Sequence, residues 1–176
     1  MKYFSFVQKS GYPNAFYRKD IRDTHFVEFY SYEDTFIKAS CKNEATKGFK
    51  SEFDILNKLS HLDFIPQVKD YKKLDGIELL FLSYIEGEEL TKHNYCEKFE
   101  KDLLNKLFDV YSAGVVHGDI KKDNILVNRT NLFLIDFDQA YTHKDNIDFS
   151  LSPDIIGNKG LNYTNLIKGM THEKHK

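Results

Sequence analysis

The sequence lacks several features that would each place it in a particular class of protein. It contains no Trp and only two cysteines, Cys41 and Cys96, which are far apart and form no C-x-x-C pair. Cysteines in this pattern argue against a disulfide framework and are typical of reduced thiols in the cytosol. We therefore expect a cytoplasmic protein.

Long hydrophobic runs and an excess of charge are also missing. No stretch approaches the ~20 apolar residues of a membrane span, and the run at residues 1–7 is too short for the core of a signal peptide. The net charge is −2, whereas a dedicated nucleic-acid binder normally carries a basic excess. These absences predict that the chain binds no nucleic acid and does not cross a membrane, although it could act at the inner membrane surface.

What the sequence does contain is typical of a globular protein with a mixed fold. Its 176 residues are 41% hydrophobic, which is enough for one core or for two small lobes that share a cleft. Aromatic and β-branched runs predict strands, and Asp75-Gly76 predicts a turn between the last two of them. Apolar residues at helical spacing predict two longer helices and one short helix. The expected strands are residues 3–7, 15–18, 26–32, 35–39, 67–72 and 77–84, and the expected helices are residues 43–60, 95–112 and 163–170.

The stretch 116–138 carries the residues with the most chemical content. Asp119 and Asn124 lie five residues apart in a short loop between an apolar run and a β-branched strand, and Asp136 ends the next apolar run. A hairpin of this kind places the three side chains at one edge of a small sheet. Oxygen ligands there suit an Mg²⁺ ion that bridges nucleotide phosphates, while Asp119 stays available to accept a proton from a hydroxyl. The alternative is an ordinary turn and an ordinary strand end, which the two patterns in this order make less favourable.

The run from His117 to Asn124, followed by Ile135-Asp136-Phe137-Asp138, resembles two loops of the protein-kinase-like superfamily. These are the catalytic loop, H-R-D-x-x-x-x-N, and the metal-binding loop, D-F-G. The resemblance implies an α+β, two-lobed fold with ATP and Mg²⁺ as cofactors. Residues 1–84 would form an N-lobe with a mostly antiparallel sheet, and residues 85–176 a shortened helical C-lobe.

The resemblance also implies roles for the polar residues of the two loops. Asp119 would orient and deprotonate the acceptor hydroxyl, and Asn124 and Asp136 would hold Mg²⁺. Lys121 would stabilise charge on the transferring phosphoryl group. Together these residues would form the catalytic and metal-binding part of the site.

In the N-lobe, Lys38 lies inside an apolar strand, where the superfamily keeps a lysine that holds the α- and β-phosphates. The alternative is an edge lysine in solvent. Glu52, on a face next to the apolar face of the expected helix, would pair with Lys38, and Glu44 is a rival partner. Adenine would bond to backbone groups around Ser83 and Ile85, where the sequence resembles the hinge between kinase lobes.

Four features depart from ordinary protein kinases. No G-x-G-x-x-G loop precedes Lys38, so residues 19–24 would cover the phosphates, with Arg22 as a charge partner. Gly118 replaces the arginine of H-R-D, which argues against control by activation-loop phosphorylation. Asp138 stands where D-F-G has glycine, and an A-P-E segment is missing. The C-lobe is therefore expected to be short, and a partner protein could complete it.

These departures are similar to those of minimal bacterial kinases, above all the lipopolysaccharide core kinases that act on heptose or Kdo. The similar segments are residues 16–38, the hinge at 84–87 and the ending at 135–138. The resemblance implies a sugar acceptor, and Lys121 and Lys122 would suit a sugar that already carries phosphate. Lys121 also matches a lysine of serine/threonine kinases, so a protein acceptor stays open. A pseudokinase that binds nucleotide or acts as a scaffold is the third alternative.

Overall fold

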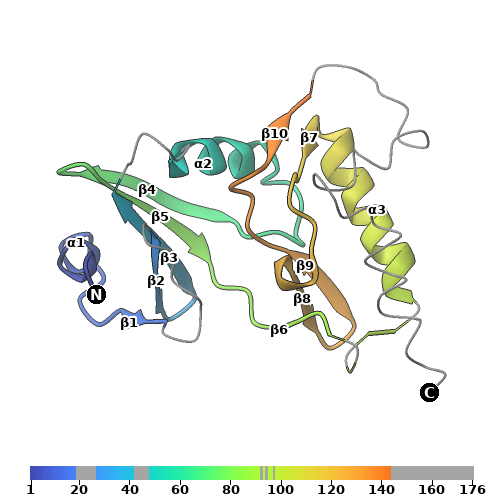
Figure 1. Cartoon of the computed structure of the whole chain (residues 1–176), viewed down its shortest axis with the longest axis horizontal. Coiled ribbons are helices and arrows are strands. Elements are labelled where there is room, and N and C mark those ends of the chain that lie inside the picture. The colour runs from blue at the N-terminus through green and yellow to red at the C-terminus, as the bar shows by residue number, and fades with distance from the viewer. Residues whose placement is uncertain (19–26, 42–47, 92, 94, 97, 144–176) are drawn as a thin grey trace. The chain divides into compact units, whose positions relative to one another are not determined.

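The computed structural model of the chain describes residues 1–18, 27–41, 48–91, 93, 95–96 and 98–143 (Figure 1). The loop expected at residues 19–24, the rival partner Glu44 and the short helix at 163–170 lie outside the described residues. Close contacts divide the chain into two compact units. The first unit comprises residues 1–60 and 66–85, and the second comprises residues 61–65 and 86–176. Within the described ranges, no helix combines the length and apolar character that a membrane crossing needs.

The first unit is built on a five-stranded antiparallel sheet in the order β1-β2-β3-β5-β4 (Figure 1). β3 is therefore the central strand, and β5 lies between it and the edge strand β4. The strands are β1 (Phe16–Tyr17), β2 (Val27–Tyr32), β3 (Thr35–Cys41), β4 (Val68–Leu74) and β5 (Ile77–Ser83). Each corresponds to a predicted strand. The predicted turn between β4 and β5 is also confirmed, because Asp75 and Gly76 both have positive φ, as a two-residue hairpin requires.

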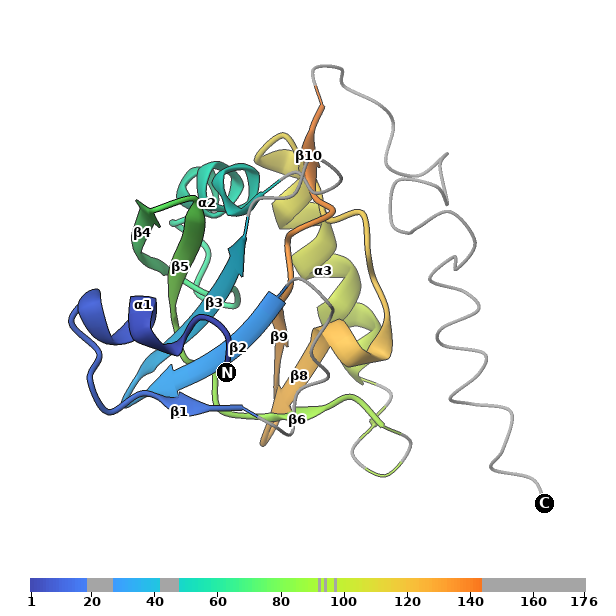
Figure 2. The ribbon, with the colours of Figure 1, turned by 60° about the vertical axis from the view of Figure 1, so that its left-hand side comes forward.

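Two helices cover opposite faces of this sheet (Figure 2). Helix α1 (Phe4–Lys9) packs on the face formed by alternate residues of β3 and β5, such as Ile37 and Phe81. Helix α2 (Phe49–Lys58) covers the other face, which carries the remaining residues of these strands, among them Lys38. The sheet therefore separates a mainly apolar layer under α1 from a layer under α2 that contains the buried pair of Lys38 and Glu52.

The strand predicted at residues 3–7 is wrong, because this segment forms helix α1. Its buried residues Tyr3, Val7 and Ser10 are spaced by four and three positions, which is the period of a helix. The aromatic residues of this segment have high strand propensity, but packing of Tyr3 and Val7 against the sheet favours a helix. The helix predicted from residue 43 is described from Phe49 onward, and its expected start lies outside the described residues.

The second unit combines one long helix with short strands. Helix α3 (Lys98–Ser112) ends before Gly114, whose φ is +76°, and residues 95–96, which were predicted to be part of it, lie outside the helix. Strands β6 (Glu88–Glu89), β8 (Ile125–Asn128) and β9 (Asn131–Leu134) form an antiparallel sheet, and β7 (Val115–Val116) pairs with β10 (Tyr141–Thr142). The buried face of α3 is the predicted one and comprises Phe99, Leu103, Leu107, Val110 and Tyr111.

Candidate active site

Lys38 and Glu52 form a buried ion pair in the first unit. The Lys38 Nζ lies 2.8 Å and 3.0 Å from the two carboxylate oxygens of Glu52. Lys38 is 6% exposed and Glu52 is 1% exposed, so the alternative of an edge lysine in solvent is wrong. Glu52 does not lie on a neighbouring face of its helix, as expected, but among the buried residues of α2. Desolvation makes such a pair a weak source of stability, so its value lies in where it fixes the lysine.

The loop after β7 is anchored by a buried histidine, His117. Its Nε2 lies 3.0 Å from the Ile135 carbonyl, and its Nδ1 lies 3.3 Å from the backbone nitrogen of Asp119. The carbonyl can only accept and the amide can only donate, so the ring is neutral, with its proton on Nε2. Burial lowers the pKa of His117 to about 4, against smaller effects of the Ile135 carbonyl and nearby carboxylates. The neutral ring thus ties the two loops together.

Gly118 allows the two loops to approach each other. Its φ is +80°, and a Cβ at this position would lie 2.5 Å from the carbonyl oxygen of Gln139. A side chain would therefore separate the loop at residues 117–124 from the segment that follows Asp136. This contact explains in physical terms why glycine stands where the kinase pattern has arginine.

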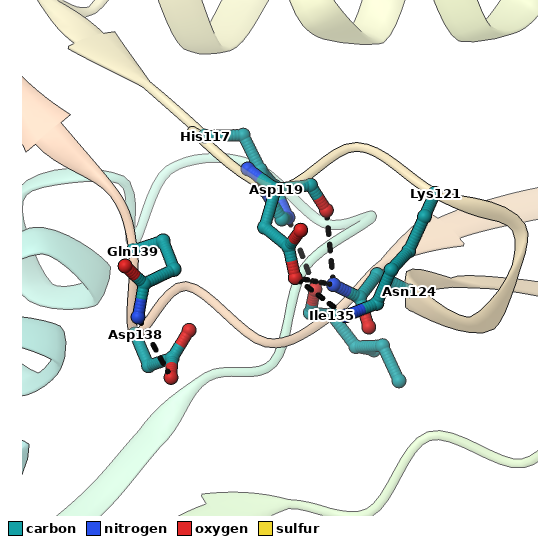
Figure 3. Close-up of polar contacts among 7 residues, drawn as sticks. All are labelled: His117, Asp119, Lys121, Asn124, Ile135, Asp138 and Gln139. Carbon is teal, nitrogen blue, oxygen red and sulfur yellow. Dashed lines mark hydrogen bonds and ion pairs between the residues drawn. The ribbon is translucent and has the colours of Figure 1, made fainter. Parts of the chain in front are cut away.

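Asp119 is held by two neighbouring side chains, as Figure 3 shows. The Asn124 Nδ2 donates to the backbone oxygen and to the Oδ2 of Asp119, at 2.9 Å in both cases. The Lys121 Nζ donates to the same Oδ2 at 2.7 Å. The hydrogen bond to Asp119 raises the pKa of Lys121, against an opposing effect of burial. The sequence therefore correctly places these three polar residues together.

Asp136 follows β9 with an unusual backbone conformation. Its φ is +64°, which is rare for a residue with a side chain and marks local strain of the kind found at functional sites. The preceding residue, Ile135, donates its N–H to the Asn124 carbonyl at 3.0 Å. The charge of Asp136 also contributes to the raised pKa of Lys121. Asp136 thus belongs to the same cluster as Lys121 and Asn124.

The hinge residues are only partly available for a ligand. Ser83 donates its N–H to the Gln67 carbonyl at 2.8 Å, and its Oγ accepts from the Gln67 N–H at 2.9 Å. Both groups are therefore used within the first unit. Ile85 is the last residue of that unit.

Sequence reasoning missed the structural role of two buried polar residues, His117 and Glu78. The sequence shows His117 only as part of a motif, whereas its two hydrogen bonds join the loop that contains Asp119 to the segment that contains Ile135. Glu78 was not singled out, although it is a lone acid in the apolar run Ile77 to Ser83. The same signal, one charged residue in an apolar strand, identified Lys38, so Glu78 could have been found in the same way.

Comparisons with known proteins identify the family of the chain. A family model for the RIO domain matches residues 14–156. The chain is similar to the serine/threonine-protein kinase cds1 of Schizosaccharomyces pombe, with 32% identity over 111 residues, 57% of this chain and 24% of that protein. It is also similar to the RIO-type serine/threonine-protein kinase Rio2 of Methanocaldococcus jannaschii, with 30% identity over 115 residues, 59% of this chain and 41% of that protein. The chain thus spans less than half the length of either relative.

Comparison with a solved structure supports the fold of the chain. The Cydia pomonella granulovirus kinase PK-1 matches with a TM-score of 0.56 and 17% identity, over 78% of this chain and 56% of that one. At this identity the likeness shows the fold alone, and it confirms the predicted α+β, kinase-like fold with an antiparallel N-lobe sheet. With most of its length matched by the family model, the chain belongs to the RIO domain family.

Proposed function

We propose that the chain is an ATP-dependent phosphotransferase whose acceptor is the hydroxyl of a protein serine or threonine. The observation that carries the proposal is the cluster in which Lys121 and Asn124 both bind the Asp119 carboxylate. Serine/threonine kinases among the relatives support a protein acceptor. They favour it over the lipopolysaccharide sugar that the resemblance to core kinases implies. The sugar acceptor, the domain boundary at residues 84/85, the shortened C-lobe and the cytoplasmic location stay predictions.

In this proposal Asp119 orients the acceptor hydroxyl and takes its proton. Asn124 fixes Asp119 by donating one hydrogen bond to its backbone oxygen and one to its carboxylate. Lys121 is part-exposed, and its raised pKa keeps it charged, so it can neutralise the phosphoryl group during transfer. Phosphoryl transfer needs mainly such positioning and charge neutralisation.

The donor set around Asn124 fits Mg²⁺ bound to a nucleotide. The Asn124 amide nitrogen donates to Asp119, so the amide oxygen is the atom that would bind the metal. The Ile135 N–H donates to the backbone carbonyl of Asn124, which connects Asn124 to the loop of Asp136. Over the part of the chain that the structure describes, no three His, Cys, Asp or Glu side chains gather into a metal site. Mg²⁺ needs few protein ligands, because phosphates and water complete its shell. When bound, it would neutralise charge on the nucleotide phosphates.

The first unit would bind the remaining parts of ATP. Lys38, fixed by Glu52, would hold the α- and β-phosphates. Because the Ser83 N–H is used by Gln67, adenine would bond to the Ser83 carbonyl and to the backbone of Ile85. The pseudokinase alternative shares these binding roles and differs only in turnover.

Metal-dependent nucleotide binding is the first test. Calorimetry should show that Mg²⁺ strengthens ATP binding and that Asp136→Ala removes this gain. Asp138→Ala is the matched control, because it removes an exposed carboxylate from the same loop and should keep the gain. If Mg²⁺ does not affect the native protein, the assignment of Asn124 and Asp136 to the metal is wrong.

Turnover is the second test. Asp119→Asn nearly preserves shape, so ATP affinity should persist while phosphate transfer falls by ~10²–10⁴-fold, the usual contribution of a general base. Asp123→Asn, an exposed change in the same loop, should leave transfer intact. Labelled ATP is offered with a protein extract and, separately, with a core-oligosaccharide extract. Label only on the oligosaccharide would overturn the protein acceptor, and no transfer to either would favour the pseudokinase.

A further inference from the structure

Glu78 is a buried acid for which the proposed chemistry gives no role. It stands in strand β5 and is 3% exposed. Its Oε2 accepts a hydrogen bond of 2.8 Å from the backbone N–H of Phe49, the first residue of α2. Helix α2 has no side-chain cap of its own. A carboxylate from the sheet therefore does what an N-cap side chain usually does.

The surroundings of Glu78 are built to keep it there. Gly48 has a φ of +67°, and a Cβ at this position would lie 2.6 Å from the Glu78 Oε2, so the close approach depends on glycine. Burial, together with the charge of Glu78 and a side-chain interaction with it, raises the pKa of Tyr71. The Tyr71 ring also lies 5.4 Å from that of Phe53 in α2. Glu78 is thus joined to α2 directly and through Tyr71.

These contacts lie on the face of the sheet that carries the Lys38–Glu52 pair. Glu78 and Leu80 are alternate residues of β5, and Leu80 is the register partner of Lys38 in β3. Glu52 follows Phe49 by three residues, so both belong to the beginning of α2. A displacement of the first turn of α2 along the sheet would therefore move Glu52 relative to Lys38.

We propose that Glu78 is a positioning residue that fixes the first turn of α2, and thereby holds Glu52 where it meets Lys38. Its effect on the reaction is indirect, through the place of the Lys38 ammonium. The inference rests on the proposed function, since it concerns nucleotide binding only if Lys38 holds phosphates. Loss of Glu78 should then weaken binding of the phosphates and spare binding of the nucleoside.

The test compares the Kd for MgATP with the Kd for adenosine in the full chain. Glu78→Ala should weaken MgATP binding about tenfold relative to adenosine, the effect of one charge-assisted hydrogen bond. Glu78→Asp keeps the charge but is shorter by one methylene. The ratio of the Kd for MgATP to the Kd for adenosine should therefore rise by about threefold. Val7→Ala is the matched control, because it removes packing on the opposite face of the sheet. It should lower the melting temperature and leave the ratio unchanged.

Lys38→Ala separates failure of this inference from failure of the proposed function. If Lys38→Ala leaves the ratio of the two Kd values unchanged, Lys38 does not hold phosphates and the proposed function is wrong at this residue. If Lys38→Ala shifts the ratio but Glu78→Asp does not, the positioning role is overturned, whether or not Glu78→Ala folds. An equal shift in Val7→Ala would also overturn it, since general destabilisation would then explain the effect.

Discussion

Acid should destabilise the protein through His117. The ring is neutral in the folded state because burial lowers its pKa from 6.5 to about 4. In the unfolded chain the same ring takes a proton below its ordinary pKa. Between these two values the unfolded state therefore binds more protons, so stability falls as the pH falls, and the loss is complete once the folded ring also protonates.

The size of the effect follows from the pKa difference. One unit corresponds to about 1.4 kcal/mol, so a change from about pH 7.5 to about pH 4.5 should cost about 2.5 kcal/mol of unfolding free energy through this group alone. The cost is a sizeable share of a typical domain stability of about 5–15 kcal/mol. Full burial of the ring keeps solvent from screening the effect.

The assay is urea unfolding across this pH range, with His117→Gln as the reference variant. Gln can still donate to the Ile135 carbonyl but does not titrate, so the native and variant curves should converge as the pH falls. Their difference isolates His117 from carboxylates such as Glu28 and Asp34, which also titrate in acid with lowered pKa values. An NMR titration should give the pKa directly. A value near 6.5, or a constant difference between the two proteins, would refute the lowered pKa of His117.

Two further changes probe the same loop. Gly118→Ala should lower the unfolding free energy by about 1–3 kcal/mol, because φ is positive here and the new Cβ would clash with the Gln139 carbonyl. Denaturant unfolding measures the loss, and Gly11→Ala, which also has a positive φ but meets no atom within 4 Å, is the matched control. Lys121→Met should change stability by less than about 1 kcal/mol, because the ion pair is part-exposed. Phosphate transfer should nevertheless fall steeply, and unchanged turnover would exclude Lys121 from the reaction.

Much of the fold was predictable because local patterns and packing agree. The strands of the sheet are aromatic or β-branched runs between turn residues, and the buried face of α3 repeats at helical spacing. Prediction failed at α1, where aromatic residues favour a strand but the spacing of Tyr3 and Val7 fits a helix. The local sequence could not distinguish a helix from a strand here, because the sheet face that α1 covers is assembled from segments distant in the sequence.

The candidate site was predictable to the extent that its residues share a local motif. Asp119, Lys121 and Asn124 lie within six residues, so the loop alone brings them together. The spacing of Phe49, Phe53, Leu56 and Leu59 predicts an apolar face that leaves Glu52 beside it, and burial of an acid is unfavourable by itself. Only the pairing with Lys38, a contact between distant segments, offsets this cost, and spacing along one helix does not reveal it.

Buried charge in the first unit is concentrated on one face of one sheet. Lys38, Glu52 and Glu78 are all nearly inaccessible, and each would cost less as an apolar residue of similar size. The opposite face, under α1, is mainly apolar, and its one part-buried acid in β2, Glu28, accepts hydrogen bonds from the Tyr3 N–H and the Tyr30 hydroxyl. Capping of α2 gives Glu78 a role in folding, but it does not account for the buried Lys38–Glu52 pair. A need to hold the Lys38 ammonium at a fixed position beside the sheet would explain both acids. Glu52 pairs with Lys38, and Glu78 fixes the first turn of the helix that carries Glu52.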